Sequence, residues 1–393
     1  MRERGLPASL LLVMAAATGL AVASNYYCQP LLPTMARAFG IPPARAGLVV
    51  TTAQVGYGLG LLLIVPLGDL LERRALVVWM SLAAAGGLFL TASAPALPLV
   101  LLGTAITGLF SVVAQVLVPF AATLAEPERR GKAVGTVMSG LLLGVLLART
   151  AAGLLANLGS WRTIYWVGGI ALIVTAAVLR RALPRHHETA GLSYPRLLLS
   201  VAALFRAEPV LRPRALLGAT SFAAFSVLWT SMGFLLAAPP YRFSAGTIGL
   251  FGLAGAAGAL AASWAGRLSD RGHGDGATGI GLALLLLSWG LLALGPRSLA
   301  GFAGGVVLLD LASQGVHISN QSAIYRLRPE ARNRLTAGYM TCYFIGGASG
   351  SLVSAWAWGA AGWAGVTAAG AGVSALGLAV WALGWFRRDP AAG

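Results

Sequence analysis

Apolar residues fill the chain in long runs, and short segments rich in arginine separate these runs. A helix needs about 20 apolar residues to cross the hydrocarbon core of a membrane. Runs of about this length predict twelve membrane-spanning helices, at Leu10–Leu32, Ala46–Leu67, Leu76–Ala92, Leu97–Leu117, Val134–Leu155, Ile164–Val178, Leu216–Leu236, Ile248–Ala265, Ile280–Leu294, Leu299–Ser319, Ala337–Trp358 and Val366–Phe386. The predicted fold class is therefore an all-α membrane protein.

The basic residues are distributed unevenly between the two sides that alternating helices would create. With the N-terminus in the cytoplasm, the inner segments hold 22 of the 28 lysines and arginines and the outer loops hold 5. Arg149 falls inside the fifth span. Loops on the cytoplasmic side of membrane proteins carry the excess of Lys and Arg. The bias therefore supports twelve spans with both termini in the cytoplasm.

The longest inner segment divides the chain into two sets of six spans. We expect an N-terminal half at residues 1–183, a basic cytoplasmic linker at 184–212 and a C-terminal half at 213–393. The linker contains His186, His187 and Glu188, but adjacent residues on a loop do not form a defined metal site. A solvated linker is the favoured interpretation, and we expect no metal.

The two halves repeat each other. Three features recur in equivalent places after 201 or 202 positions: Pro127–Lys132 with Pro329–Arg334, Trp161 with Trp363, and Asp69 with Asp270. Parallel six-helix halves around a central site are a transporter architecture. The repeat therefore predicts a pseudo-symmetric bundle with a site between its halves.

Composition excludes several classes of protein. The chain of 393 residues is 57% hydrophobic and 10% charged, whereas soluble domains carry about 25% charged residues. This gap excludes an ordinary soluble enzyme, a disordered protein and a disulfide scaffold. The net charge of +16 resides in short loops, so we expect no nucleic-acid partner. Cys28 and Cys342 lie in apolar runs and are expected to be packed thiols.

The loop after the second predicted helix resembles the hallmark of the major facilitator superfamily, Gly-x-x-x-Asp-Arg-x-Gly-Arg-Arg. Here it reads Val65-Pro66-Leu67-Gly68-Asp69-Leu70-Leu71-Glu72-Arg73-Arg74. The second half contains a closer copy, Gly266-Arg267-Leu268-Ser269-Asp270-Arg271. The resemblance extends over essentially the whole chain. It implies the twelve-helix major facilitator fold and a gating role for Asp69, Arg73, Arg74, Asp270 and Arg271.

The first predicted helix resembles a particular branch of that family. Its run Asn25-Tyr26-Tyr27-Cys28-Gln29-Pro30 is similar to the twelve-span drug:proton antiporters, closest to the bacterial branch that exports nucleosides, sugars and drugs. This resemblance implies a bacterial inner-membrane location. Two departures count against carrying over the family's proton relay unchanged: Arg149 replaces the fifth-helix proline, and Thr104 replaces the fourth-helix arginine.

Three ionisable residues lie within predicted spans, where charged groups are costly and usually functional. Asp310 is near the middle of the tenth span, His317 is on the same helix, and Arg149 is in the outer half of the fifth span. A carboxyl group takes up a proton more readily when buried and releases it more readily beside a cation. Asp310 is therefore the expected proton carrier, with His317 as relay. Arg149 either extends to the outer interface or pairs with Asp310.

Polar residues form stripes on three of the helices that line the central cavity in the resembling family. At 100° per residue, Gln314, His317 and Gln321 lie within about 40° of Asp310 on the tenth helix. The first helix contributes Asn25 and Gln29, and the fourth contributes Ser111 and Gln115. The seventh helix presents the aromatic residues Phe222, Phe225 and Trp229. Such stripes either bind substrate or join helices, since interhelical hydrogen bonds also stabilise bundles.

These features predict a secondary transporter that exports a small organic molecule in exchange for protons. Substrate would bind to Asn25, Tyr26, Gln29, Gln115, Trp229, Gln314 and Gln321. We expect a monomer in the lipid bilayer with no cofactor. An uptake symporter or facilitator on the same fold stays open. A membrane-embedded enzyme is a remote alternative, since the chain contains neither His-Glu-x-x-His nor Gly-x-Ser-x-Gly.

Overall fold

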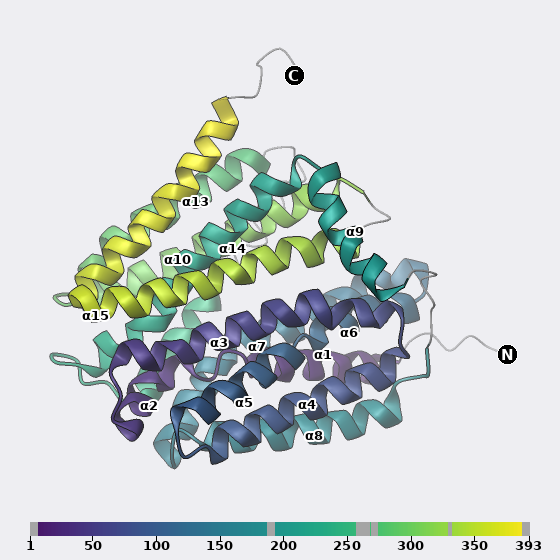
Figure 1. Cartoon of the computed structure of the whole chain (residues 1–393), viewed down its shortest axis with the longest axis horizontal. Coiled ribbons are helices and arrows are strands. Elements are labelled where there is room, and N and C mark those ends of the chain that lie inside the picture. Colours follow the sequence, from purple (N-terminus) through teal and green to yellow (C-terminus); the bar gives the residue numbers. More distant parts are fainter. Residues whose placement is uncertain (1–6, 187–192, 257–267, 269–273, 329–331, 387–393) are drawn as a thin grey trace. The chain divides into compact units, whose positions relative to one another are not determined.

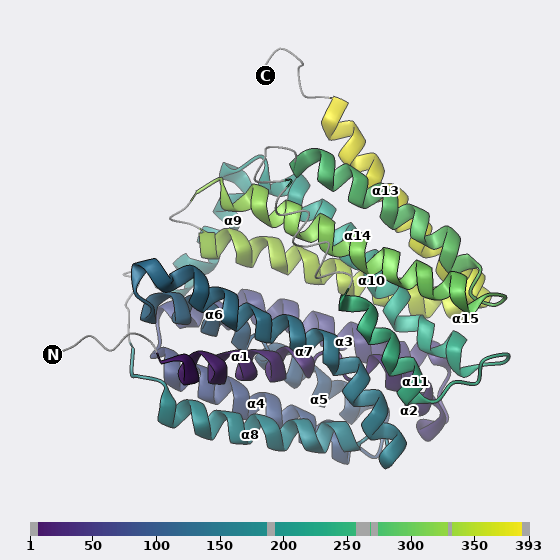
Figure 2. The same ribbon diagram turned by 180° about the vertical axis from the view of Figure 1, so that it is seen from behind.

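The computed structural model describes residues 7–186, 193–256, 268, 274–328 and 332–386. These residues form helices joined by turns, with no strand in the described ranges (Figures 1 and 2). Nine helical stretches among them are long and apolar enough to cross a membrane. This architecture confirms the predicted all-α membrane class.

The first part of the chain builds the elements from α1 to α8. Their bounds are α1 Ala8–Ala23, η1 Gln29–Leu31, α2 Leu32–Phe39, α3 Pro43–Leu63, η2 Val65–Asp69, α4 Arg73–Ser93, α5 Leu97–Phe110, α6 Val113–Leu124, η3 Pro127–Arg129, α7 Arg130–Leu158 and α8 Thr163–Ala182. The second part builds α9 Tyr194–Ala207, α10 Leu211–Ala237, α11 Ala245–Leu250, η4 Phe251–Ala254, α13 Gly274–Ala293, α14 Leu299–Tyr325 and α15 Arg332–Phe386.

The helices group into two compact units. Unit 1 comprises Met1–Phe39, Thr52–Leu198 and Ser244–Gly252, and unit 2 comprises Gly40–Thr51, Leu199–Phe243 and Leu253–Gly393. In unit 1, α4 and α8 run side by side, and α1 packs against α7. In unit 2, α10 packs along α15, and α13 packs along α14.

Small residues let helix backbones touch in both units. In unit 1, a Cβ added at Gly144 of α7 would lie 2.2 Å from the carbonyl oxygen of Gly19 in α1. In unit 2, a Cβ added at Gly346 of α15 would lie 2.1 Å from the carbonyl oxygen of Ala219 in α10. Such close approach through small residues is typical of membrane helices. Gly144 and Gly346 are 202 positions apart, the offset of the predicted repeat.

The first predicted span is not one continuous helix. Helix α1 ends at Ala23, and a turn over residues 24–28 separates it from η1. Backbone bonds at the turn join residues three apart, from Tyr26 N to Ala23 O (2.9 Å) and from Leu31 N to Cys28 O (2.9 Å). Pro30 accounts for the break, because proline lacks an N–H and its ring clashes with the carbonyl four residues earlier.

Three other predicted spans, the fourth, the eleventh and the twelfth, differ from the structure in their details. The fourth divides into α5 and α6 around Ser111, and Pro119 lies inside α6. The eleventh and twelfth spans are both within α15, where Ala361 and Gly362 depart from helical geometry. Gly362 has φ of 57°, a conformation that glycine adopts without steric cost. The kink therefore separates the two spans as predicted.

The predicted linker contains a helix that the sequence interpretation missed. Three apolar side chains of α9 are buried, at the helical spacing of Leu197, Val201 and Leu204. The helix was missed because its 14 residues are too few for a span.

The eighth predicted span is described only in part. The described positions there comprise α11, η4 and the two residues after them.

Candidate functional site

In unit 2, the side chain of Asp310 accepts a hydrogen bond from a tryptophan. Asp310 on α14 is 2% exposed, and Trp229 on α10 is also 2% exposed. The indole Nε1 of Trp229 donates a hydrogen bond to Oδ1 of Asp310 at 3.1 Å. Because an indole nitrogen can only donate, this contact holds a carboxyl oxygen as acceptor. Asp310, the predicted proton carrier, and Trp229, a predicted substrate-binding residue, are therefore direct partners.

His317 lies two turns further along α14 and has a different partner. Its Nδ1 is 3.1 Å from the hydroxyl of Tyr339 on α15, and its ring centroid is 4.6 Å from that of Tyr343. Seven residues of helix separate Asp310 and His317 by about 10 Å along the axis. The two predicted proton-handling groups thus share a helix face while each contacts a different neighbouring helix.

A row of aromatic rings connects the surroundings of His317 with those of Asp310. Tyr343 stacks on Phe222 with centroids 4.1 Å apart, Phe222 stacks on Phe225 at 5.5 Å, and Phe225 lies 5.9 Å from Trp229. This row of four rings, here called the aromatic ladder, leads from His317 to Asp310. The sequence interpretation identified its three α10 members and missed Tyr343. The spacing of Tyr339 and Tyr343, one helical turn apart, was the available signal.

The two glutamines of α14 are half-buried. Gln321 donates through Nε2 to the sulfur of Met340 on α15 at 3.8 Å. Gln314 lies between Asp310 and His317 in the sequence, within the same predicted stripe. Both positions are compatible with a lining role, which stays a prediction.

In unit 1, Arg149 on α7 is buried among residues of the broken first helix. It is 1% exposed, which excludes the alternative of a side chain extending to the outer interface. Its Nε donates to Oε1 of Gln29 at 2.5 Å, and its guanidinium carbon lies 5.0 Å from the Tyr26 ring centroid. A Cβ added at Gly252 would come within 2.9 Å of Arg149 Cβ. The predicted pairing of Arg149 with Asp310 stays a prediction.

Asn25 borders a small polar cavity. The cavity has a volume of about 10 Å³ and is lined by Ser24, Asn25, Cys28, Ala53, Leu88, Thr91, Thr104, Thr107 and Tyr165. Four polar atoms around it have no hydrogen-bond partner within the described part of the chain. They are Nδ2 and Oδ1 of Asn25 and the hydroxyl oxygens of Thr104 and Tyr165. A space of this size accommodates about one water molecule.

Gln115, another predicted substrate-binding residue of unit 1, lies on α6 and hydrogen-bonds to Tyr57 of α3.

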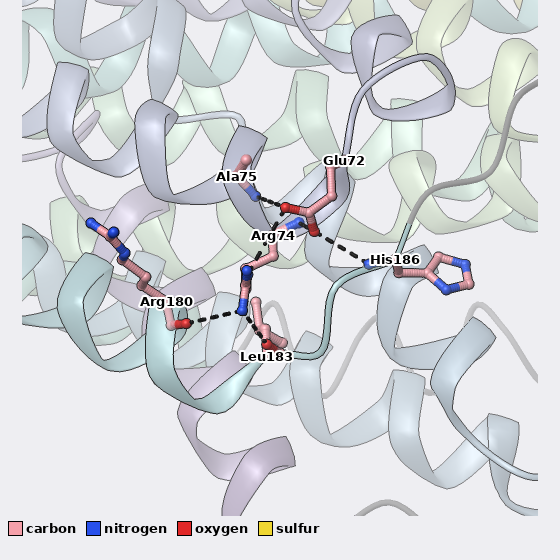
Figure 3. Close-up of polar contacts among 6 residues, drawn as sticks. All are labelled: Glu72, Arg74, Ala75, Arg180, Leu183 and His186. Atoms are coloured by element: carbon pink, nitrogen blue, oxygen red, sulfur yellow. Dashed lines mark hydrogen bonds and ion pairs between the residues drawn. The ribbon is translucent and has the colours of Figure 1, made fainter.

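The predicted gating arginines of unit 1, Arg73 and Arg74, hold neighbouring elements together, and Figure 3 shows the contacts of Arg74. Arg73 is 8% exposed, and it donates to the Gly68 carbonyl (3.3 Å) and to the Thr123 hydroxyl (3.1 Å). Arg74 donates to the carbonyls of Arg180 and Leu183, both at 3.4 Å. Asp69 ends η2, and its gating role stays a prediction. Asp270 and Arg271 lie outside the described residues.

A buried ion pair in unit 2 was missed by the sequence interpretation. Arg214 of α10 is 6% exposed and forms an ion pair with Asp275 in the first turn of α13. It also donates to the Thr278 hydroxyl (3.0 Å) and to Oδ1 of Asn320 (3.1 Å). Arg214 had been counted among the basic residues of the inner segments. The available signal was its position two residues before the seventh predicted span, Leu216–Leu236.

Known proteins share both sequence and fold with this chain. The family model described as Major Facilitator Superfamily matches residues 14–324. The uncharacterized transporter YgaY of Escherichia coli O157:H7 is 60% identical over 350 residues, which cover 89% of each chain. The chloramphenicol resistance protein of Streptomyces lividans is 28% identical and covers 89% of this chain and 88% of its own.

A solved structure shows the same architecture. The bacterial homologue of the human lysosomal transporter Spinster, in an inward-facing and occupied conformation, aligns with a TM-score of 0.77, 14% identity and 98% coverage of both chains. This likeness concerns the fold alone. The family match, the close relatives and the helical architecture agree, and the chain belongs to the Major Facilitator Superfamily.

Proposed function

We propose that this transporter exports a small, partly apolar organic molecule by alternating access, driven by the entry of protons. The observation that carries the proposal is the hydrogen bond from Trp229 to Asp310, because it joins a buried ionisable group to the aromatic ladder. A buried carboxyl is costly and is rarely retained without a function. Asp310 is the proton carrier in this proposal, and His317 relays protons to it.

The aromatic ladder gives proton binding a way to affect substrate binding. Protonation of Asp310 removes the charge that the Trp229 indole faces, and so weakens a charge-assisted hydrogen bond. Trp229 is then freer to change its orientation against a stacked substrate. A ligand or a proton can shift a conformational equilibrium only through such differential contacts.

Unit 1 supplies the polar contacts in this proposal. Gln29 is held by Arg149 in the break of the first helix, and Asn25 has unbonded polar atoms beside a small cavity. Broken helices at the middle of transporters often form substrate sites. Asn25, Gln29 and Gln115 would therefore bind polar groups of the substrate, and Tyr26 would stack on it. Asp69, Arg73 and Arg74 would control opening on the cytoplasmic side.

Export is favoured over uptake by one relative, and the aromatic ladder bears on the kind of substrate. A chloramphenicol resistance protein is similar over 89% of this chain, and resistance to a drug is consistent with its export. The rings of Phe222, Phe225 and Trp229 suit a substrate with an apolar part. We place the protein as a monomer in the bacterial inner membrane, with both termini in the cytoplasm.

Uptake by a proton symporter or facilitator is the second candidate. The observation in its favour is Arg149, which stands where the resembling antiporters have a proline in the fifth helix and which bonds Gln29 instead. A fixed buried cation can serve substrate binding without proton exchange, since arginine does not deprotonate in proteins.

One experiment separates these functions. A thermal-shift screen of nucleosides, sugars, amino acids and aromatic drugs first identifies a substrate for the purified protein. The protein is then reconstituted into vesicles that contain a pH-sensitive dye. Substrate entry driven by its own gradient makes the lumen alkaline if protons leave in exchange, acidic if protons accompany it, and leaves the pH unchanged for a facilitator. An acidic or unchanged lumen would contradict the proposed antiport.

A further inference from the structure

A groove lies on unit 1 between α4 and α8. It has a volume of about 550 Å³ and is lined by Glu72, Arg74, Ala75, Val78, Trp79, Leu82, Arg180 and Arg185. The two helices run side by side, and the groove lies where α4 begins and α8 ends. Its lining divides into a charged part and an apolar part.

The charged part has an excess of arginine. Arg180 and Arg185 are exposed, and Arg74 is 21% exposed. Glu72 is the one carboxylate among the described residues that line the groove. It accepts from three backbone N–H groups, those of Arg74 (3.0 Å), Ala75 (3.1 Å) and His186 (3.3 Å). Its charge is thus directed toward the start of α4 (Figure 3). The groove therefore presents a net positive end.

Arg74 sets the shape of this end. Its Nη1 donates to the carbonyls of Arg180 and Leu183, and its Nε lies 3.9 Å from Glu72. The backbone at the end of α8 is thereby fixed against the start of α4. The Arg180 side chain extends away from Arg74, as Figure 3 shows. Arg74 positions the groove, and Arg180 and Arg185 remain accessible to a ligand.

The apolar part continues along α4. Trp79 is 70% exposed and Leu82 is 36% exposed. Trp79 lies five residues after Arg74, or about 7.5 Å along the helix axis. Tryptophan is enriched at the level of lipid headgroups, where its ring meets both acyl chains and water. The exposed ring thus marks the depth at which the charged part meets the hydrocarbon.

We propose that this groove binds one anionic phospholipid, with its phosphodiester against Arg180 and Arg185 and an acyl chain along Trp79 and Leu82. Guanidinium groups bind phosphate oxygens through paired, charge-assisted hydrogen bonds. Basic pockets between membrane helices bind anionic lipid headgroups. The apolar wall selects a lipid over a free phosphate, because a free phosphate gains nothing from contact with Trp79 and Leu82.

The proposal is tested on the full chain in detergent by native mass spectrometry with phosphatidylglycerol or phosphatidylcholine added. We expect one phosphatidylglycerol to bind in preference to phosphatidylcholine. The variant Arg180→Gln/Arg185→Gln should weaken phosphatidylglycerol binding about 25-fold, since each arginine near an anionic headgroup contributes about fivefold. Trp79→Ala should weaken binding of the lipid while the preference for the anionic headgroup persists.

A matched variant controls for total charge. Arg129→Gln/Arg130→Gln removes two exposed arginines at the start of α7, outside the groove, and should bind phosphatidylglycerol as the unaltered protein does. Melting temperatures identify any variant that fails to fold. Equal binding of both lipids, equal losses in the two double variants, or displacement of the lipid by inorganic phosphate at the lipid's own concentration would each overturn the proposal.

Discussion

The indole nitrogen of Trp229 lies 3.1 Å from Oδ1 of Asp310, and both residues are 2% exposed. Trp229 also ends the aromatic ladder, 5.9 Å from the ring of Phe225. A single side chain therefore contacts both a buried carboxyl group and the buried row of aromatic rings. The first two predictions test this pair.

Replacement of Asp310 by asparagine should abolish transport driven by a proton gradient and leave substrate exchange intact. The amide oxygen of asparagine can still accept from Trp229, so the fold should be preserved. Counterflow and gradient-driven uptake are measured in the same vesicles. Full gradient-driven transport in Asp310→Asn would rule out Asp310 as the proton carrier.

Replacement of Trp229 by phenylalanine keeps a ring in place but removes the donor. Loss of one partner of a buried hydrogen bond costs about 1–3 kcal/mol. The variant should therefore unfold at a lower temperature than the unaltered protein, whereas Trp79→Phe at an exposed ring should not. Equal melting temperatures for the two variants would show that the bond contributes little to stability.

A double-mutant cycle tests whether Arg149 and Asp310 meet. If they do, Arg149→Gln leaves a buried charge without its partner, at a cost of about 3–5 kcal/mol. Adding Asp310→Asn should then restore much of the lost stability. Thermal unfolding of both single variants and the double variant gives the interaction energy. Strictly additive losses would mean that the two charges act independently.

The ion pair between Arg214 and Asp275 should contribute more to stability than the pair between Arg328 and Glu208. Arg214 is 7% exposed in its side chain, whereas Arg328 is 46% exposed. Asp275→Asn removes the partner of a buried charge and should cost about 3 kcal/mol. The matched Glu208→Gln should cost about 1 kcal/mol or less. Melting temperatures of the two variants provide the comparison.

Asp69→Ala should favour the inward-open state if Asp69 helps to close the cytoplasmic side. The chain has two cysteines, Cys28 and Cys342, so a background without them allows single reporter cysteines to be introduced on that side. Labelling of such reporters should become faster in Asp69→Ala. The same labelling rates with and without the substitution would argue against a gating role.

The repeating apolar runs were sufficient to predict the all-α membrane fold, because lipid requires each span to satisfy its own backbone. Asp310 and Arg149 stood out for a related reason, since a charge in an apolar run has few structural explanations. The break before Pro30 was visible in the sequence, but the length of the apolar run outweighed it. The short helix α9 was missed because its 14 residues are fewer than a membrane span needs.

The partners of these residues could not be derived from the sequence. Helical periodicity places Asp310 and His317 on one face of α14, but it does not fix the rotation or height of the neighbouring helices. The contacts with Trp229 and Tyr339 depend on that packing. Arg214 illustrates the same limit, since its burial follows from Asp275, Thr278 and Asn320, which lie on two other helices.

The turn at residues 24–28 gives the first helix a hinge, called the joint below. On one side of it, Gly19 fixes α1 against Gly144 of α7 with no side chain between the backbones. Across it, the backbone bonds join residues three apart, and the regular ladder of a helix is interrupted. Bending here breaks fewer hydrogen bonds than bending a continuous helix would. Asn25 lies within the joint and Gln29 directly follows it, so a ligand that binds these two residues acts where the helix bends most easily.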